Sequence, residues 1–440
     1  MTRLWEPFAY SDAPRADCAW ALDRDWPGLD GDLATDVAVI GGGFTGLSAA
    51  LHLAQAGAQV TVLEANAPGW GASGRNGGFC CLGGAKVSDA TLVRRFGPGA
   101  DDAWFAAEMA AVDLVAGLLE THGIDANTHS DGEVLLAHRP RAYRGFAEDA
   151  ATFRRRGVEA EVLPPEAMKE RGLNAAGTHG GLFFRKGFAL DPGAYVAGLA
   201  RATQRAGADI RARAPVHAVT REPAGFRLAT PTGTVTARRL LVATGGYSSE
   251  HLPPWLGGRF LPVQSSIIMT RPLTADEQAA QGWTSDLIAY DSRKLLHYFR
   301  LLPNGRFLFG MRGGIRATPR AQAHIARKIR ADFARLFPAW AGVEIGNEWS
   351  GLVTLSARRT PYVGPIPELD GAFAALAYHG NGVAMGSYSG AMVADLILGR
   401  APTRPYPDAM RDPLLRFPAP RFRRGLFAGV MALMALSDRL

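Results

Sequence analysis

Cysteine and long apolar runs are both scarce in this chain of 440 residues. Its three cysteines, Cys18, Cys80 and Cys81, are too few for a disulfide framework and show no zinc-binding spacing. Scarce cysteine favours a reducing compartment, so we expect a cytoplasmic protein with no metal site. No apolar run reaches the roughly 18 residues of a membrane span. The N-terminus also lacks the charged start and apolar core of a signal peptide.

A block of lysines and arginines is absent too, although the formal net charge is +7. Because the arginines are spread along the chain, the sequence predicts no nucleic-acid binding. An anionic cofactor and anionic small-molecule substrates account better for the basic balance. Glycine, by contrast, is plentiful, and the positions of its clusters guide the rest of the interpretation.

One complete strand–helix–strand unit is predicted near the N-terminus. Residues 36–40 form a short apolar run typical of a buried parallel strand. A glycine-rich turn follows, and then apolar residues recur on one face of a predicted helix over residues 47–54. Residues 59–63 predict a second strand, and Glu64 stands at its carboxyl end.

The turn of this unit has the glycine spacing of a dinucleotide-binding site. Gly41, Gly43 and Gly46 suit a tight turn, room for a pyrophosphate and close packing of the helix on the strand. The start of the helix offers free N–H groups to the phosphates, and Glu64 is placed to accept hydrogen bonds from ribose hydroxyls. The alternative is a plain strand–helix unit whose glycines only form the turn. An acid at this position disfavours NADP, but periodicity does not decide between FAD and NAD.

The next loop carries a resemblance that favours FAD. Residues 68–78 form a polar loop rich in Gly, Ser and Asn, and its segment GASGRNGG (71–78) resembles the flavin loop of the D-amino-acid oxidase/glycine oxidase superfamily. Within that superfamily, the gamma-glutamylputrescine oxidoreductase-like branch is the most similar, and L-pipecolate oxidases look similar too.

The resemblance covers roughly residues 35–400 and implies the architecture. We expect an α/β protein in which a Rossmann-type FAD-binding domain is interleaved with an α+β substrate domain built on an antiparallel sheet. The expected segments are an N-terminal arm (1–34), the FAD-binding domain (35–90, 188–255 and 345–440) and the substrate domain (91–187 and 256–344).

The same resemblance extends the list of expected FAD contacts beyond the first glycine turn. A strand ending in Ala-Thr-Gly-Gly and a second glycine-rich turn before a helix near Gly386 match the family's cofactor segments. In the family, the second turn holds the pyrimidine end of the flavin, and its helix start stabilises negative charge on the reduced ring. The expected contacts are Gly41, Gly43, Phe44, Thr45, Gly46, Glu64, Ala65, Gly71, Ala72, Ser73, Arg75, Asn76, Gly77, Gly78, Val216, Ala243, Thr244, Gly245, Gly380, Asn381, Gly382 and Val383.

Candidate catalytic residues come from a hairpin predicted by its Asn304-Gly305 turn. Arg300 and Arg312 are candidates for gripping a substrate carboxylate, because guanidinium groups bind carboxylates bidentately. Tyr298 would add a hydroxyl or an aromatic wall, and His297 would take an amine proton near neutral pH. The alternative is that the arginines are solvated strand residues and that His297 is structural.

Two further segments have two interpretations each. Cys80 and Cys81 follow the flavin loop, where they would line the pocket and be redox-sensitive, or simply be small buried residues. Residues 422–440 are basic and then apolar, and too short to span a bilayer. They would pack on the protein's own surface or a partner subunit, or lie in a membrane interface as a peripheral contact.

These observations predict an FAD-dependent oxidoreductase acting on an amine or amino acid. A hydride would pass from the carbon next to nitrogen to flavin N5, and the resulting imine would hydrolyse. Oxygen, a quinone or a partner protein would accept the electrons. The alternatives are a flavin dehydrogenase subunit that passes electrons to quinone or a partner, a non-catalytic FAD-binding subunit, and an NAD-linked dehydrogenase without flavin.

Overall fold

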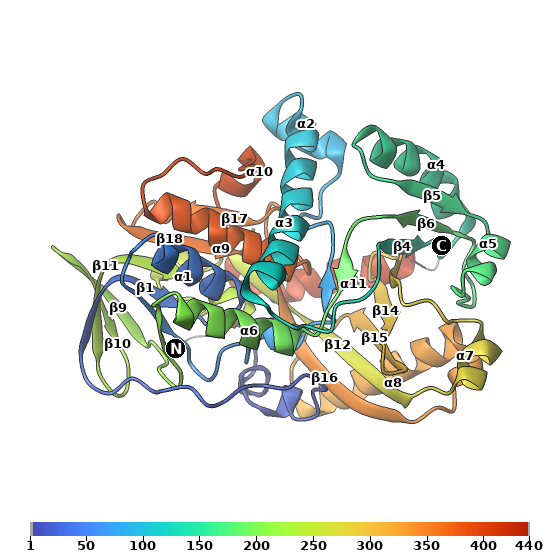
Figure 1. The fold of residues 1–440 in the computed structure, drawn as a ribbon, viewed down its shortest axis with the longest axis horizontal. Coiled ribbons are helices and arrows are strands. Elements are labelled where there is room, and N and C mark those ends of the chain that lie inside the picture. The colour runs from blue at the N-terminus through green and yellow to red at the C-terminus, as the bar shows by residue number, and fades with distance from the viewer. Residues whose placement is uncertain (1–2, 439–440) are drawn as a thin grey trace.

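The computed structural model describes residues 3–438, which fold around two large β-sheets (Figure 1). One sheet lies with its covering helices on the left of Figure 1, and the other extends to the right, where β14 and β15 are labelled. The fold is the expected mixed α/β architecture, with a dinucleotide-type sheet beside a mainly antiparallel one.

The first sheet contains the predicted strand–helix–strand unit. In the described chain it has eight strands, with the order β17-β18-β11-β1-β2-β8 and with β10 and β9 continuing from β11. Strand β1 pairs in parallel with β2 on one side and β11 on the other. Its strands are β1 (Leu33–Ile40), β2 (Val60–Leu63), β8 (Asp209–Arg211), β9 (Ala218–Glu222), β10 (Gly225–Ala229), β11 (Thr234–Val242), β17 (Tyr362–Pro365) and β18 (Ala372–Leu376).

Helices cover one face of this sheet, and a β-hairpin packs on the other. The helices are α1 (Phe44–Gln55), α3 (Ala100–His122), α6 (Pro192–Arg205) and α9 (Ala384–Ile397). They share one apolar core with the sheet residues Val37, Val39 and Val62. On the opposite face, Ala38 and Ile40 pack with Phe226 of the β9–β10 hairpin. The alternation along β1 therefore buries both faces, as expected for a parallel strand.

The second sheet is antiparallel except for the parallel pair β13–β4. Within residues 3–438 it has eight strands: β16 (Ile345–Ser356), β12 (Phe260–Pro272), β15 (Arg306–Arg312), β14 (His297–Leu301), β13 (Ile288–Asp291), β4 (Glu133–Leu136), β6 (Gly181–Phe184) and β5 (Ala160–Leu163). The Asn304-Gly305 turn joins β14 to β15 as predicted, with Gly305 at φ +77°. Helix α8 (Pro319–Leu336) packs Phe333 against Phe307 and Phe309 of β15.

Two segments pack on a different sheet from the one that their expected domain implies. Helix α3 belongs to residues expected in the substrate domain, yet its Trp104 and Val115 lie in the core beneath the first sheet. Strand β16 begins at Ile345, the expected start of cofactor-domain chain, but it pairs with β12 along the second sheet. The local sequence of a long strand or helix does not indicate which sheet it packs on, because its partners are distant in the chain.

The remaining elements are short or peripheral. They are β3 (Phe79–Cys80), β7 (Phe188–Ala189), α2 (Asp89–Phe96), α4 (Pro140–Arg155), α5 (Pro165–Glu170), α7 (Ala275–Gln281), α10 (Asp408–Arg411) and α11 (Arg423–Ser437). The N-terminal arm is irregular apart from two turns of 3-10 helix. It is anchored by Trp5, whose indole N–H donates to Pro262 O, and by Trp20, which donates to Asn76 O at 2.8 Å.

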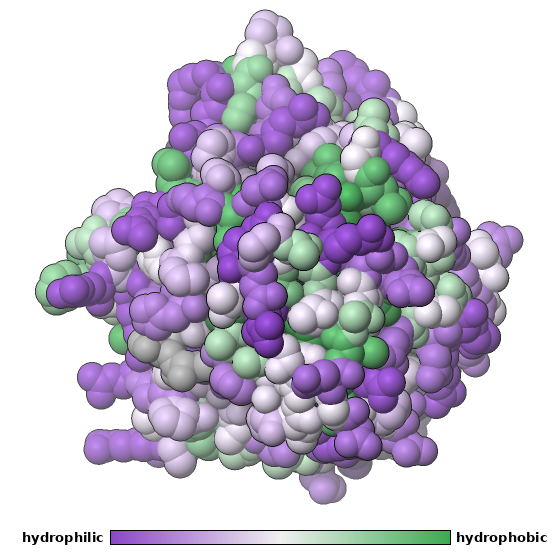
Figure 2. All heavy atoms as spheres, turned by 90° about the vertical axis from the view of Figure 1, so that its left-hand side faces the viewer, coloured by the Kyte–Doolittle hydropathy of each residue, from purple (hydrophilic) through white to green (hydrophobic). Residues whose placement is uncertain are grey.

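The face of the molecule on which the β9–β10 hairpin lies is mainly hydrophilic, with apolar side chains scattered across it (Figure 2). No helix among the described residues is long and apolar enough to cross a membrane.

Candidate active site

A large cavity opens at the carboxyl ends of the first sheet's strands and extends against the second sheet. Its empty volume, which includes open solvent at the mouth, is about 2280 Å³. Most of the expected FAD contacts line it: Gly41, Gly43, Phe44, Thr45, Glu64, Ala65, Gly71, Ala72, Ser73, Arg75, Asn76, Gly77, Val216, Ala243, Thr244, Gly245, Gly380, Asn381, Gly382 and Val383. Gly46 and Gly78 are not among the described lining residues, and both sit directly behind the lining.

The first glycine turn is shaped by close backbone approaches. Gly41 has φ +110°, and a Cβ there would lie 2.7 Å from Ala243 O. A Cβ on Gly46 would lie 1.9 Å from Gly41 O, so only glycine lets α1 start this close to β1. Gly43 is the N-cap residue of α1 and provides no side-chain cap, which leaves the positive end of the helix open toward the cavity.

Glu64 stands at the end of β2 with its carboxylate held by two backbone donors. Its Oε2 accepts from Gly42 N at 2.8 Å and its Oε1 accepts from Asn66 N at 2.9 Å. Burial raises the pKa of this carboxyl, and the backbone hydrogen bonds oppose that rise. A carboxylate oxygen can accept more than one hydrogen bond, and Glu64 lines the cavity, so it can also accept from ribose hydroxyls.

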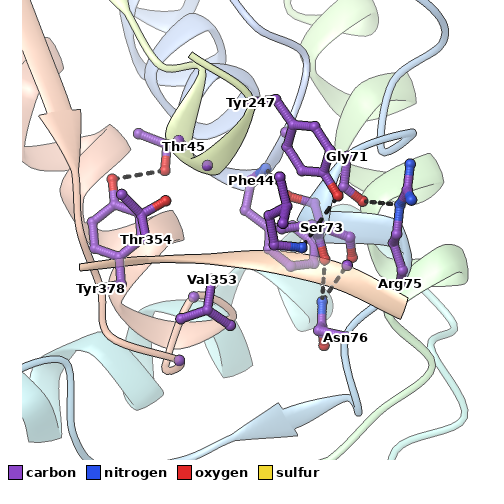
Figure 3. Close-up of a pocket in the computed structure, with 18 of the residues that line it drawn as sticks. Phe44, Thr45, Gly71, Ser73, Arg75, Asn76, Tyr247, Val353, Thr354 and Tyr378 are labelled. Carbon is purple, nitrogen blue, oxygen red and sulfur yellow. Dashed lines mark hydrogen bonds between the residues drawn. The ribbon is translucent and has the colours of Figure 1, made fainter. Parts of the chain in front are cut away.

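The flavin-type loop is rigid because its own side chains close it (Figure 3). Ser73 accepts from Phe44 N at 3.0 Å and so ties the loop to the start of α1. Asn76 donates to Ser73 O at 2.8 Å and accepts from Gly78 N at 2.8 Å. Arg75 is buried, donates to Trp70 O and Ser350 O, and stacks over the Trp70 ring at 4.3 Å. One of its nitrogens, Nη2, has no partner among the described residues.

The second glycine turn faces the first across the cavity. Tyr378 shares a 2.9 Å hydrogen bond with Thr45 at the start of α1 (Figure 3). His379 is buried, and burial lowers its pKa to about 3, so the ring is neutral at neutral pH. Its Nδ1 donates to Gly84 O at 2.9 Å and its Nε2 accepts from Ser356 N at 3.2 Å. Helix α9 then begins without a side-chain cap, so a second helix start points into the same cavity.

On the second-sheet side, two of the four candidate catalytic residues line the cavity. The Tyr298 hydroxyl lies 3.0 Å from Ser265 Oγ, and burial raises its pKa to about 12, so it stays a neutral donor. Arg312 donates from Nη2 to His379 O at 2.8 Å, and burial lowers its pKa. A Cβ on Gly380 would lie 2.0 Å from Arg312 Nη2, so the guanidinium packs directly on the second glycine turn.

A lysine that the sequence analysis did not single out also lines this end. Lys86 lies in the segment after the flavin-type loop, and its backbone N–H donates to Arg359 O. Its side chain is exposed within the cavity. Enclosure by protein, together with the charge of Arg312, lowers its pKa to about 8. No motif marks Lys86, because only the folded loop brings it to Arg312.

The other two candidates, His297 and Arg300, are not among the described residues that line the cavity. Arg300 is fully buried, donates to Leu190 O at 2.8 Å and faces His129 Nε2 at 3.0 Å. His297 is enclosed between Asp291, at 2.7 Å from Nδ1, and Asp332, at 3.3 Å from Nε2. Burial alone would lower the pKa of His297, but its hydrogen bonds to the two carboxylates raise it.

The adjacent cysteines separate. Cys80 is buried in β3, while Cys81 lines the cavity with its Sγ 3.1 Å from Asn381 Nδ2. Burial raises the pKa of both thiols well above the ordinary value, so neither is a thiolate at neutral pH. Neither forms a disulfide. No cluster of three potential metal ligands occurs among residues 3–438.

These features together define a site for a dinucleotide that carries a flat ring. The two helix starts, the glycine backbone without room for a Cβ and the buried acceptor Glu64 fit FAD. The model of the FAD-dependent oxidoreductase family DAO matches residues 36–396. The chain therefore belongs to this family, and FAD is its cofactor.

Relatives of known name match nearly the whole chain. A probable oxidoreductase, OrdL, of Rhizobium meliloti is 32% identical over 94% of this chain and 94% of its own length. The gamma-glutamylputrescine oxidoreductase of Escherichia coli is 30% identical over 94% of this chain and 95% of its own. The solved glycine oxidase of Geobacillus kaustophilus superposes with a TM-score of 0.72 over 88% of this chain and all of its own. At 22% identity, that likeness shows the fold alone.

Substitution of Gly390 in α9 tests how the two helix starts are positioned. A Cβ at this residue would lie 2.4 Å from Thr45 O, so Gly390→Ala should push α9 away from α1. We expect a loss of about 1–3 kcal/mol in unfolding free energy and less FAD retained per chain. Thermal unfolding and flavin absorbance measure both. Gly117→Ala in α3, where a Cβ meets nothing within 4 Å, should leave both unchanged or slightly improved.

The enclosure of His297 predicts a structural effect of its removal. Because the pKa of His297 is raised in the folded protein, its protonated ring stabilises the fold at pH values below the ordinary histidine pKa of about 6.5. That contribution is lost as the pH rises through the folded pKa. His297→Gln should therefore cost about 1–3 kcal/mol at pH 6 and less at pH 9, with the flavin spectrum unchanged. Urea unfolding at the two pH values measures this, and a pH-independent cost would contradict it.

Proposed function

We propose that the protein oxidises an amine or amino acid that carries a carboxylate, using bound FAD as the hydride acceptor. The observation that carries this is the pair of cations, Lys86 and Arg312, at the second-sheet end of the cofactor cavity. Arg312 is bonded to a carbonyl rather than a carboxylate, and Lys86 forms no ion pair with any described residue. Glu108 acts on Lys86 only through its charge, so neither cation forms a salt bridge in the described chain, and the pair is suited to an anionic ligand.

The names of relatives support the substrate class. One is a gamma-glutamylputrescine oxidoreductase and others are glycine oxidases. Structures of the same fold include an L-proline dehydrogenase of P. horikoshii, with a TM-score of 0.68 and 20% identity. Each of these compounds contains both a carbon–nitrogen bond and a carboxylate.

In this proposal, the residues of the chain bind and orient. Arg312 and Lys86 hold the substrate carboxylate, and the Tyr298 ring forms a wall of the same chamber. The local positive charge disfavours a protonated amine, so the cavity selects the neutral form that can lose hydride. FAD, which the two glycine turns and Glu64 would hold, would supply the acceptor for the hydride from the carbon next to nitrogen, and the imine product would hydrolyse. Oxygen, a quinone or a partner protein then accepts the electrons.

The direct test is to mix the purified holoprotein with amines in the absence of oxygen and follow the flavin band. We expect bleaching by one or more of gamma-glutamylputrescine, pipecolate, proline, sarcosine and glycine. The matched compounds putrescine and pyrrolidine, which lack the carboxylate, should bleach at least tenfold more slowly than gamma-glutamylputrescine and proline. Admitting oxygen separates an oxidase, which recolours quickly, from a dehydrogenase. A flavin that no amine reduces would favour a non-catalytic FAD-binding subunit and overturn the proposal.

The role of Lys86 has its own pH signature. With the best substrate, kcat/KM should rise as the amine loses its proton and then level off above pH about 8, because Lys86 becomes neutral there while the amine is still losing its proton. Lys86→Met should lower kcat/KM at pH 7 about tenfold or more and let the rise continue beyond pH 8. Lys86→Arg should restore binding and also remove the levelling near pH 8, because a guanidinium keeps its charge. An unchanged levelling in Lys86→Met would assign it to another group.

A further inference from the structure

The large exposed apolar side chains of the described residues are confined to one segment near the C-terminus. The large hydrophobic residues with substantial exposure are Leu415, Phe422, Leu426, Val430, Leu433 and Leu436. Five of them recur every three or four residues from Phe422 to Leu436 and so share one face of α11. We call this face the α11 apolar face. Leu433 is 69% exposed and Phe422 is 71% exposed, so the fold leaves this face uncovered.

The opposite side of α11 is fixed to the protein at both ends. At its start, Arg423 pairs with Glu250 and donates to Phe260 O, and Arg424 pairs with Glu6. At its end, Asp438 accepts from Lys294 N at 2.9 Å and from Leu295 N at 3.0 Å. The helix is therefore an ordered part of the fold with a defined outward face.

The surroundings of this face are basic. Residues 413–437 contain four arginines and no acidic residue. Arg423 and Arg424 are used in pairing, while Arg416 and Arg421 are exposed beside Leu415 and Phe422. An exposed apolar face with cations at its border is the pattern of a helix that lies in a membrane interface. Anionic lipid headgroups complement that charge.

A lipid surface fits this face better than a second protein chain. The apolar side chains form a single row along one helix of 15 residues. A stable protein interface needs roughly 800 Å² per partner with a broad, well-packed centre. A single row enters the headgroup region without such a matching surface. The helix is too short to span a bilayer, so it would lie parallel to the membrane.

We propose that the α11 apolar face docks the protein on an anionic lipid surface. The contacts of α11 also indicate which side of the cavity would face the membrane after docking. Asp438 binds Leu295, next to the cavity residue Leu296, and Met431 lies beside the position of a Cβ on Gly313, next to Arg312. Docking would therefore turn the substrate side of the cavity toward the membrane. The proposed docking does not depend on which substrate the protein oxidises.

Flotation of the FAD-loaded full chain with vesicles tests the proposal. We expect binding to vesicles of phosphatidylcholine with about 30% phosphatidylglycerol, and at least tenfold weaker binding to phosphatidylcholine alone. The double variant Leu426→Ser/Leu433→Ser should bind at least tenfold more weakly. Arg421→Glu should also weaken binding. Arg400→Glu, with the same charge change on an exposed residue after α9, should bind as the wild type does.

Flavin absorbance and thermal unfolding show whether the variants remain folded. We expect them to fold, because the substituted leucines are exposed. Absence of binding to either vesicle would overturn the proposal. So would equal binding by the wild type and a folded double variant. Sedimentation of the wild type as a dimer that the double variant loses, without lipid binding, would assign the face to a second copy and overturn the lipid proposal.

Discussion

The close crossing of helices α1 and α9 is the constraint on which the cofactor site depends. Gly390 lies so near the backbone of α1 that a Cβ would be 2.4 Å from Thr45 O and 2.8 Å from Ser48 Cβ. At the same crossing Ser48 Oγ donates to Ser387 O at 2.7 Å. Neither N-cap residue supplies a side-chain cap, and this contact brings the two positive helix ends to one cavity. An anionic dinucleotide with a ring that becomes anionic on reduction suits that arrangement.

The two ends of the cavity are built by different means. The cofactor end consists mainly of backbone, in which glycine turns, helix starts and Glu64 come from one sheet and the loops after its strands. The other end consists of side chains such as Tyr298, Arg312 and Lys86, which reach in from the second sheet and an adjoining loop. Backbone sites vary little with sequence, whereas side-chain walls set the substrate. The position of α11 beside this wall would also link substrate entry to the surface on which the protein rests.

Strand β14 shows which features of a strand can be predicted from the sequence and which cannot. The two-residue period places Tyr298 and Arg300 on one face, and both lie near the Phe79 ring. Tyr298 reaches the cavity because it lies across Gly310 of β15, where a Cβ would be 2.1 Å from its ring. Arg300, two residues on, is covered by Leu190 and His129. Periodicity gives the face of a strand, but not which other segment covers each position on it.

The first glycine turn and the flavin-type loop of the cofactor site could be predicted from the sequence alone. Gly41, Gly43 and Gly46 with Glu64 form a local unit whose conformation depends on neighbouring residues, so their spacing predicts the site. The loop at 71–78 is likewise closed by its own side chains, as Asn76 shows. The folded chain was needed to see the rest, including the meeting of Lys86 with Arg312, the enclosure of His297 by Asp291 and Asp332, and the exposed face of α11. The reason is that each of these depends on contacts between segments far apart in the chain, whose pairing no local pattern records.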